Sequence, residues 1–301
     1  MSISPTHPVR VPGARRTSAS SLLAALALAG TLLGALPVGV AGAQPADTTR
    51  RSTRPLFTSR DAVAAGIFAL GTIAAIPLDK VAARRLQNPR AQGNRFLRHQ
   101  ATNVRLVAEP GSLIIGGALY GAGRLSGNRR MADLGLHGTE AIGVGLGVVT
   151  VAKILAGRAR PYVDVNDPGN FGFGRGLSHE EYRSFPSGHT VMAFSAAAAV
   201  TSETSRWWPQ SRWYVGPVMY GGASLVGLSR MYNNKHWASD VLVGAAVGTF
   251  AGLKTVRYHH SHPGNRIDKW LLSGAIAPAP SGGYALSLTI LPGLGMRNEE
   301  R

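Results

Sequence analysis

The chain has 301 residues, 45% of them hydrophobic, a formal net charge of +17 at pH 7 and no cysteine. Without cysteine the chain can form no disulfide, no zinc–thiolate site and no thiol nucleophile. No basic helix or aromatic-interleaved strand accompanies the positive charge, which argues against nucleic-acid binding. An anionic membrane surface or a phosphorylated substrate fits the arginine-rich composition better.

The first 43 residues have the pattern of a secretory signal peptide. Three basic residues, Arg10, Arg15 and Arg16, precede the apolar run SLLAALALAGTLLGALPVGV, and small residues follow it at 41–43. This order of basic, apolar and small-residue segments predicts export, with cleavage after Ala43. An uncleaved anchor helix is the alternative. In either case we expect the protein in the cell envelope.

Six helical segments follow a polar, arginine-rich lead-in at residues 44–60. We expect an all-α fold whose helical domain occupies residues 61–257. The basic stretch between its first two helices is interpreted as amphipathic or solvated, and the long Gly/Pro/Asp-rich loop before the fourth helix as functional. The apolar periodicity predicts helices at about 61–86, 108–124, 131–157, 189–204, 213–229 and 237–257.

The remaining segment, residues 258–301, is interpreted as a tail with a small β-hairpin. Residues 284–290 alternate with strand period, a Ser-Gly-Gly turn precedes them, and the run AIAPA is the candidate partner strand. The three histidines of YHHSHPG at the start of this segment are interpreted as part of the tail rather than as a metal site. His137 and Glu140, which lie one helical turn apart, are interpreted as a satisfied polar pair.

The predicted helices are short for membrane spans. A span needs about 20 apolar residues, and the mean hydropathy of the chain is only +0.03. In addition, three spans after a cleaved signal would place the loop before the fourth helix in the cytoplasm. These observations favour a core that does not span the membrane or is only shallowly embedded. The uncharged runs cover residues 62–78, 110–123, 141–152 and 241–253.

Two clusters of polar residues lie at ends of predicted helices, before and after the long loop. KILAGRARP places Lys153 and Arg160 two helical turns apart. PSGH, residues 186–189, stands directly before an apolar, alanine-rich run. A serine and a glycine in that place indicate a helix N-terminus, where free backbone N–H groups and the helix dipole favour an anion.

A third cluster, SRMYNNKHWASD, combines a cation with a histidine–aspartate pair. Arg230 precedes His236 and Asp240, whose i, i+4 spacing lets the carboxylate accept from one imidazole nitrogen and orient the other. Each cluster alone also fits ordinary helix capping or a structural ion pair. Together they supply what phosphoryl transfer needs, because cations and N–H groups neutralise phosphate oxygens, one histidine attacks phosphorus and another protonates the leaving oxygen.

The three clusters resemble the signature of the type 2 phosphatidic acid phosphatase/vanadium haloperoxidase superfamily, which reads K-x6-RP, PSGH and SR-x5-H-x3-D. This sequence departs from it at no position. The resemblance covers roughly residues 60–257, and its specific motifs lie between 153 and 240. It implies the six-helix core bundle of the acid phosphatase/haloperoxidase type and a phosphoric monoester hydrolase that needs no metal or other cofactor.

The resemblance also implies a role for each motif residue. His236 would be the nucleophile that forms a phosphohistidine, with Asp240 holding its ring. His189 would be the general acid for the leaving group and would later activate water. The phosphate oxygens would be held by Lys153, Arg160, Ser187, Gly188 and Arg230.

The expected activity is a metal-independent phosphatase with its active site outside the cytoplasm. Its substrates would be lipid phosphates, such as phosphatidate or an isoprenyl diphosphate, or nonspecific monoesters. One alternative is a vanadium-dependent haloperoxidase, because vanadate fills the same anion site in the superfamily. The other is a non-catalytic basic envelope protein that binds anionic lipid, against which the intact histidine–aspartate pair argues.

Overall fold

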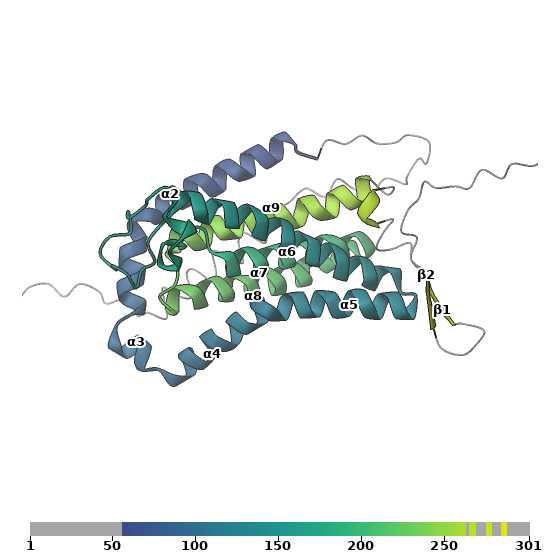
Figure 1. Cartoon of the computed structure of the whole chain (residues 1–301), viewed down its shortest axis with the longest axis horizontal. Helices are drawn as coiled ribbons and strands as arrows, with labels where there is room; N and C mark the ends of the chain where they lie inside the picture. The colour runs from purple at the N-terminus through teal and green to yellow at the C-terminus, as the bar shows by residue number, and fades with distance from the viewer. Residues whose placement is uncertain (1–55, 263–264, 269–274, 279–283, 288–301) are drawn as a thin grey trace, which may run out of the picture.

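A computed structural model describes residues 56–262, 265–268, 275–278 and 284–287 of the chain. The predicted signal peptide, most of the polar lead-in and parts of the tail lie outside these residues. The described part is helical apart from its loops and one two-stranded ribbon (Figure 1). The expectation of an all-α fold is therefore met by the core of the molecule.

Eight α-helices occur in the described residues. Six of them lie where the apolar periodicity predicts them. The other two, α3 and α4, were not predicted as helices, and each begins at an asparagine whose side chain accepts a hydrogen bond from a backbone N–H of the first turn. The helices are α2 (Ser59–Leu86), α3 (Pro89–Gly93), α4 (Arg95–Leu106), α5 (Ser112–Ser126), α6 (Arg129–Ala156), α7 (Gly188–Trp207), α8 (Arg212–Tyr232) and α9 (Ala238–Ser261).

The centre of the bundle is the close packing of α7 against α9, with α6 beside both and α8 against α7. Glycine makes this approach feasible. A Cβ atom at Gly248 would lie 2.5 Å from the backbone oxygen of Val191, and one at Gly252 would lie 2.6 Å from that of Ser195. Because the two backbones almost touch, α7 and α9 hold the residues at their N-terminal ends in a fixed relation.

Three helices, α2, α6 and α9, are long and apolar enough to cross a membrane. The expectation of helices too short to span is wrong for these three, because each continues through the charged residues that bound its uncharged run. On α2 several large apolar side chains face outward, with exposed fractions of 63% for Val63 and 69% for Leu70. The part of the chain that the structure describes thus has three candidate transmembrane helices, which corrects the preference for a non-spanning core.

Helix α9 ends later than predicted, and the tail after it contains a short β-ribbon. Helix α9 continues to Ser261, so the first two histidines of YHHSHPG are helical and not part of a tail. Farther on, β1 (Ala275–Pro278) pairs antiparallel with β2 (Tyr284–Ser287), with Ala275 opposite Ser287. This ribbon lies where the sequence places the hairpin.

Candidate functional site

The three predicted clusters meet at one end of the bundle, on the left in Figure 1, where the long loop between α6 and α7 folds over the helix ends. Lys153 lies in the last turn of α6, and α7 and α9 both begin here. The backbone N–H of Ser187 donates to the carbonyl of Asp240 at 3.1 Å. The starts of the two central helices are thereby joined.

The PSGH motif forms the N-terminus of α7, as predicted. Ser187 is the fully buried N-cap residue, and its hydroxyl accepts a hydrogen bond from the Thr190 hydroxyl at 2.8 Å. Gly188 opens the helix beside Lys153, whose Cε would lie 3.7 Å from a Cβ at this position. Because the first N–H groups of a helix have no intrahelical acceptor, this turn and the lysine together favour an anion.

The cations of the site are held by backbone carbonyls and by burial. Lys153 Nζ donates to the Arg183 carbonyl at 2.6 Å, and Arg160 Nε donates to the Glu180 carbonyl at 3.1 Å. Arg230 is only 6% exposed, and its Nε has no hydrogen-bond partner among the residues that the structure describes. A buried donor without an acceptor is uncommon in folded proteins, and it is suited to a ligand oxygen.

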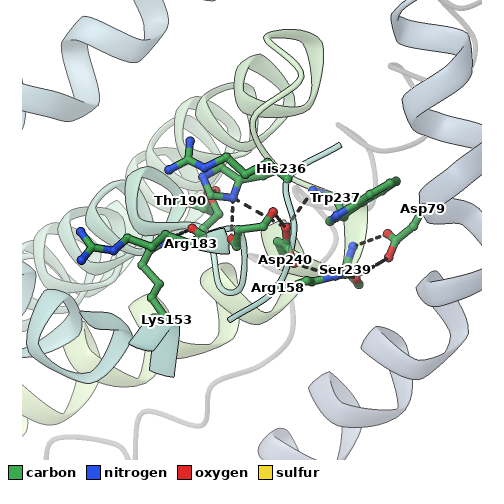
Figure 2. A network of polar contacts seen from close by, with 12 residues as sticks. Asp79, Lys153, Arg158, Arg183, Thr190, His236, Trp237, Ser239 and Asp240 are labelled. Atoms are coloured by element: carbon green, nitrogen blue, oxygen red, sulfur yellow. Dashed lines mark hydrogen bonds and ion pairs between the residues drawn. The ribbon is translucent and has the colours of Figure 1, made fainter. Parts of the chain in front are cut away.

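His236 is oriented by a carbonyl rather than by the aspartate that the sequence suggested. Its Nδ1 lies 2.7 Å from the Ser184 carbonyl oxygen and 3.7 Å from Asp240 Oδ2 (Figure 2). Because a carbonyl can only accept, Nδ1 carries the proton and Nε2 keeps the lone pair. The distance of 3.7 Å to Asp240 Oδ2 is too long for the expected hydrogen bond from the ring to this carboxylate.

Burial sets the protonation state of His236. The side chain is 4% exposed, and burial lowers its pKa to about 4, against the opposing effect of the Asp240 carboxylate. The nearby positive charges of Lys153 and Arg160 lower the pKa further. His236 is therefore neutral at neutral pH and available as a nucleophile.

Arg158 is a site residue that sequence reasoning missed. It is 2% exposed and binds two carboxylates at once: Nη1 donates to Asp240 Oδ1 at 2.6 Å and Nη2 to Asp79 Oδ2 at 2.8 Å (Figure 2). Arg158 lies between the two cations of the first motif, at a position that the signature leaves unspecified. Its partner Asp79 gave a signal in the sequence, because it is the lone acidic residue in an apolar run of α2.

Asp240 also stabilises the structure around the site through its hydrogen bonds. Its Oδ2 accepts from the Ser184 hydroxyl at 2.6 Å and from the backbone N–H of Trp237 at 2.9 Å, which caps α9. Asp79 caps the same helix by accepting from the N–H of Ser239 at 2.8 Å. Both carboxylates therefore stabilise the N-terminus of α9, which begins two residues after His236.

His189 faces a carboxylate that the sequence did not indicate. Its Nε2 lies 3.1 Å from Glu109 Oε2, which comes from η1 (Val107–Gly111), the kink between α4 and α5. Glu109 has extended backbone angles within this kink and is followed by Pro110. Burial nevertheless lowers the pKa of His189 to about 3, with Arg230 contributing. The imidazole is therefore neutral at neutral pH.

All three motifs, with the histidines, the buried cations and the helix N-terminus, fall inside one family profile. The PAP2 superfamily profile matches residues 136–263. This part of the chain, less than half of its length, is thus similar to the PAP2 superfamily. It contains α6 to α9, except for the first turns of α6, and the loop that joins α6 to α7.

Curated PAP2-type relatives match over part of their length. The lipid A 1-phosphatase of Porphyromonas gingivalis is 38% identical over 116 residues, which are 38% of this chain and 22% of the relative. The undecaprenyl-diphosphatase of Sulfolobus acidocaldarius is 28% identical over 136 residues, which are 44% of this chain and 63% of the relative. The chain thus spans less than two thirds of the length of either protein.

The fold of this chain also occurs in a solved structure. A transmembrane PAP2-type phosphatidylglycerolphosphate phosphatase from Bacillus subtilis superposes with a TM-score of 0.52 at 22% sequence identity. The match covers 69% of this chain and 99% of that chain. At this identity the likeness shows that the helical architecture is shared.

Proposed function

We propose that this protein is a membrane-embedded lipid phosphatase that acts through a phosphohistidine. The observation that carries the proposal is a pair of buried groups at this end of the bundle. They are the neutral imidazole of His236 with its lone pair at Nε2, and the Arg230 Nε donor, which has no acceptor among the described residues. Binding alone would require the cations but not the oriented imidazole of His236.

In the first step a phosphate group binds among Lys153, Arg160, Arg230 and the first N–H groups of α7. Nε2 of His236 attacks phosphorus, a P–N bond forms and the P–O bond to the leaving group breaks. His189 donates a proton to the departing oxygen. The cations and N–H groups stabilise the charge on the three equatorial oxygens in the transition state.

In the second step His189, now neutral, takes a proton from water as the water oxygen attacks phosphorus. The P–N bond breaks, inorganic phosphate leaves and His236 regains its lone pair. Because His189 is neutral at neutral pH, the proton of the first step arrives with the monoanionic form of the substrate phosphate, whose second pKa is about 6. The Glu109 carboxylate then favours the protonated imidazole that it faces.

The outward-facing apolar side chains of α2 favour a lipid over a soluble ester as substrate. The two curated relatives are named for lipid A and for undecaprenyl diphosphate, and we propose a lipid phosphate or lipid diphosphate of this kind. A recess of about 480 Å³ next to the site offers room for a head group. It is lined by Arg84, Gln87, Asn234 and residues 161–165.

The test is phosphate release by purified protein in chelator, from a lipid phosphate and from a soluble aryl phosphate measured side by side. We expect release from the lipid, little from the aryl ester, and loss of both in His236→Ala. The matched control is His99→Ala, because His99 is an exposed histidine on α4. Equal rates on both substrates would identify a nonspecific phosphatase, and full activity of His236→Ala would overturn the mechanism.

A further inference from the structure

A second cluster of titratable residues lies at the opposite end of the bundle from the phosphate site. It contains His137 of α6, Glu203 of α7, His259 of α9 and Asp268 after α9. His137 precedes Lys153 by 16 positions on α6, so the two residues lie ~24 Å apart along the helix axis. The proposed phosphatase mechanism uses none of these residues.

We propose that Nε2 of His137, Nδ1 of His259 and Oδ1 of Asp268 form a binding site for a divalent transition-metal ion of the Zn²⁺ class. These three atoms lie within 4.8 Å of one another. His137 Nε2 is 3.7 Å from Asp268 Oδ1, and His259 Nδ1 is 2.7 Å from the same oxygen. Neighbouring ligands around a tetrahedral Zn²⁺ lie roughly 3.3 Å apart, which falls between these distances.

His137 supplies an independent sign of a missing ligand. Its side chain is only 3% exposed, and Nε2 has no hydrogen-bond partner among the described residues. Its other nitrogen, Nδ1, lies 2.5 Å from Glu203 Oε1, so the proton of the neutral ring belongs at Nδ1. Nε2 thus keeps a buried lone pair 3.7 Å from Asp268 Oδ1, and the His259 ring stacks on the His137 ring with 4.2 Å between the ring centroids.

The groups around the three ligands have the arrangement of a second coordination shell. Metal-binding histidines usually donate their other N–H to a carboxylate, which fixes the ring and its tautomer. His137 does so through Glu203, and His259 Nε2 contacts Glu140 in the same way. Asp268 is oriented by Asn265, whose Nδ2 donates to Oδ2 at 2.7 Å and leaves Oδ1 facing the histidines.

The same contacts indicate what the ion would replace. His259 has a carboxylate at both ring nitrogens, so each nitrogen carries a proton in the metal-free state. A metal ion would take the place of the proton at Nδ1. The His259 ring, which stacks on the His137 ring, would turn so that Nδ1 points at the ion. Water would complete the coordination, since the protein supplies three ligands.

A second set of atoms competes for the ion in principle, formed by His137, Glu203 and His260. His260 Nε2 already lies 2.9 Å from both oxygens of Glu203, and His137 Nδ1 occupies one of them. We therefore assign Glu203 and His260 to the supporting shell. This assignment separates the two sets experimentally, because only one of them needs Asp268.

The experiment is a Zn²⁺ titration of the full chain, purified without a histidine tag and stripped with chelator. Bound metal is measured by elemental analysis after gel filtration, and Co²⁺ is used in parallel because its visible absorption reports tetrahedral coordination. We expect about one ion per chain and a higher Tm with Zn²⁺. The variants His137→Ala and Asp268→Asn should lose both effects, whereas His260→Ala should keep the ion.

Two further variants serve as matched controls. His262→Ala removes an exposed histidine from the same segment and should bind as the unmodified chain does, and His236→Ala excludes the phosphate site as the source of binding. Asp268→Asn preserves the size of the side chain, so its folding can be verified by an unchanged Tm without metal. Absence of retained Zn²⁺ in the unmodified chain, or equal retention by Asp268→Asn, would overturn the proposal.

Discussion

In the proposed mechanism, the Ser184 carbonyl determines which nitrogen of His236 attacks phosphorus, because it accepts the proton of Nδ1. Asp240 Oδ2 lies 3.7 Å from that nitrogen, and the Asp240 carboxylate accepts hydrogen bonds from Arg158, Ser184 and Trp237. Its contribution to catalysis is therefore electrostatic, and its contribution to stability comes from capping α9 and neutralising a buried guanidinium.

Asp240→Asn tests this division. Removing one charge from a buried pair typically costs ~3–5 kcal/mol of stability, and Arg158 would be left with Asp79 alone. We expect a clear fall in Tm together with a fall in kcat, whereas a purely catalytic aspartate would change kcat alone. Thermal unfolding in detergent and phosphate release are measured on the same preparations. An unchanged Tm would contradict the structural role.

The pH dependence follows from the two histidines. Protonation removes the nucleophilic lone pair of His236, whose pKa burial lowers to about 4, so kcat/KM should fall as the pH drops through about 4 rather than 6.5. In the proposed mechanism, His189 receives its proton from the monoanionic form of the substrate phosphate. Because this form is lost above a pH of about 6, kcat/KM should also fall on the basic side. An acid limb near pH 6.5 would show that His236 is not buried in the working enzyme.

Helices α7 and α9 carry the site, and their contact depends on glycine. At Gly248 a Cβ would lie 2.5 Å from a backbone oxygen of α7, which cannot move aside as a side chain can. We expect Gly248→Ala to destabilise the chain by ~1–3 kcal/mol despite the better helix propensity of alanine. The control is Gly143→Ala on α6, where nothing lies within 4 Å.

Thermal unfolding distinguishes the two glycine variants. Gly143→Ala should be neutral or slightly stabilising, and Gly248→Ala should lower Tm. It should also lower kcat, because a shift of α9 against α7 moves His236 relative to the N-terminus of α7. A Tm of Gly248→Ala equal to that of Gly143→Ala would mean that the two helices are not in close contact.

The helices of the core and the motif residues could be predicted from the sequence, because apolar periodicity and fixed motif spacing are local signals. The helix start at Ser187 is one example, since a serine and a glycine before an apolar run have few other structural meanings. The basic stretch containing α3 and α4 was missed because its asparagine caps are visible only once the helices are assigned.

Contacts between distant segments could not be predicted. Arg158 and Asp79 are 79 positions apart, and nothing in the sequence pairs one with the other. His137 and Glu140 were paired with each other because they lie one turn apart, but they contact Glu203 and His259 instead. A single sequence does not reveal which polar residues share a buried space, and this also applies to the proposed metal site.

At the scale of the whole molecule, three candidate spans and an apolar outer face predict stable membrane insertion. We expect the chain to remain in the membrane pellet after extraction with alkaline carbonate, which releases proteins bound by charge alone. The high net charge of +17 makes this distinction necessary, because it would also attract a peripheral protein to anionic lipid. Recovery in the supernatant would contradict the assignment of spanning helices.

The link between α2 and the site through Arg158 has a mechanical consequence. Helix α2 presents apolar side chains outward, and its Asp79 binds both Arg158 and the start of α9. A helix tilts when the thickness of the surrounding hydrocarbon does not match its apolar length. A tilt of α2 would move Asp79, and Arg158 would transmit this movement to Asp240 because it binds both carboxylates. The rate of the proposed dephosphorylation should therefore vary with the acyl-chain length of the host bilayer.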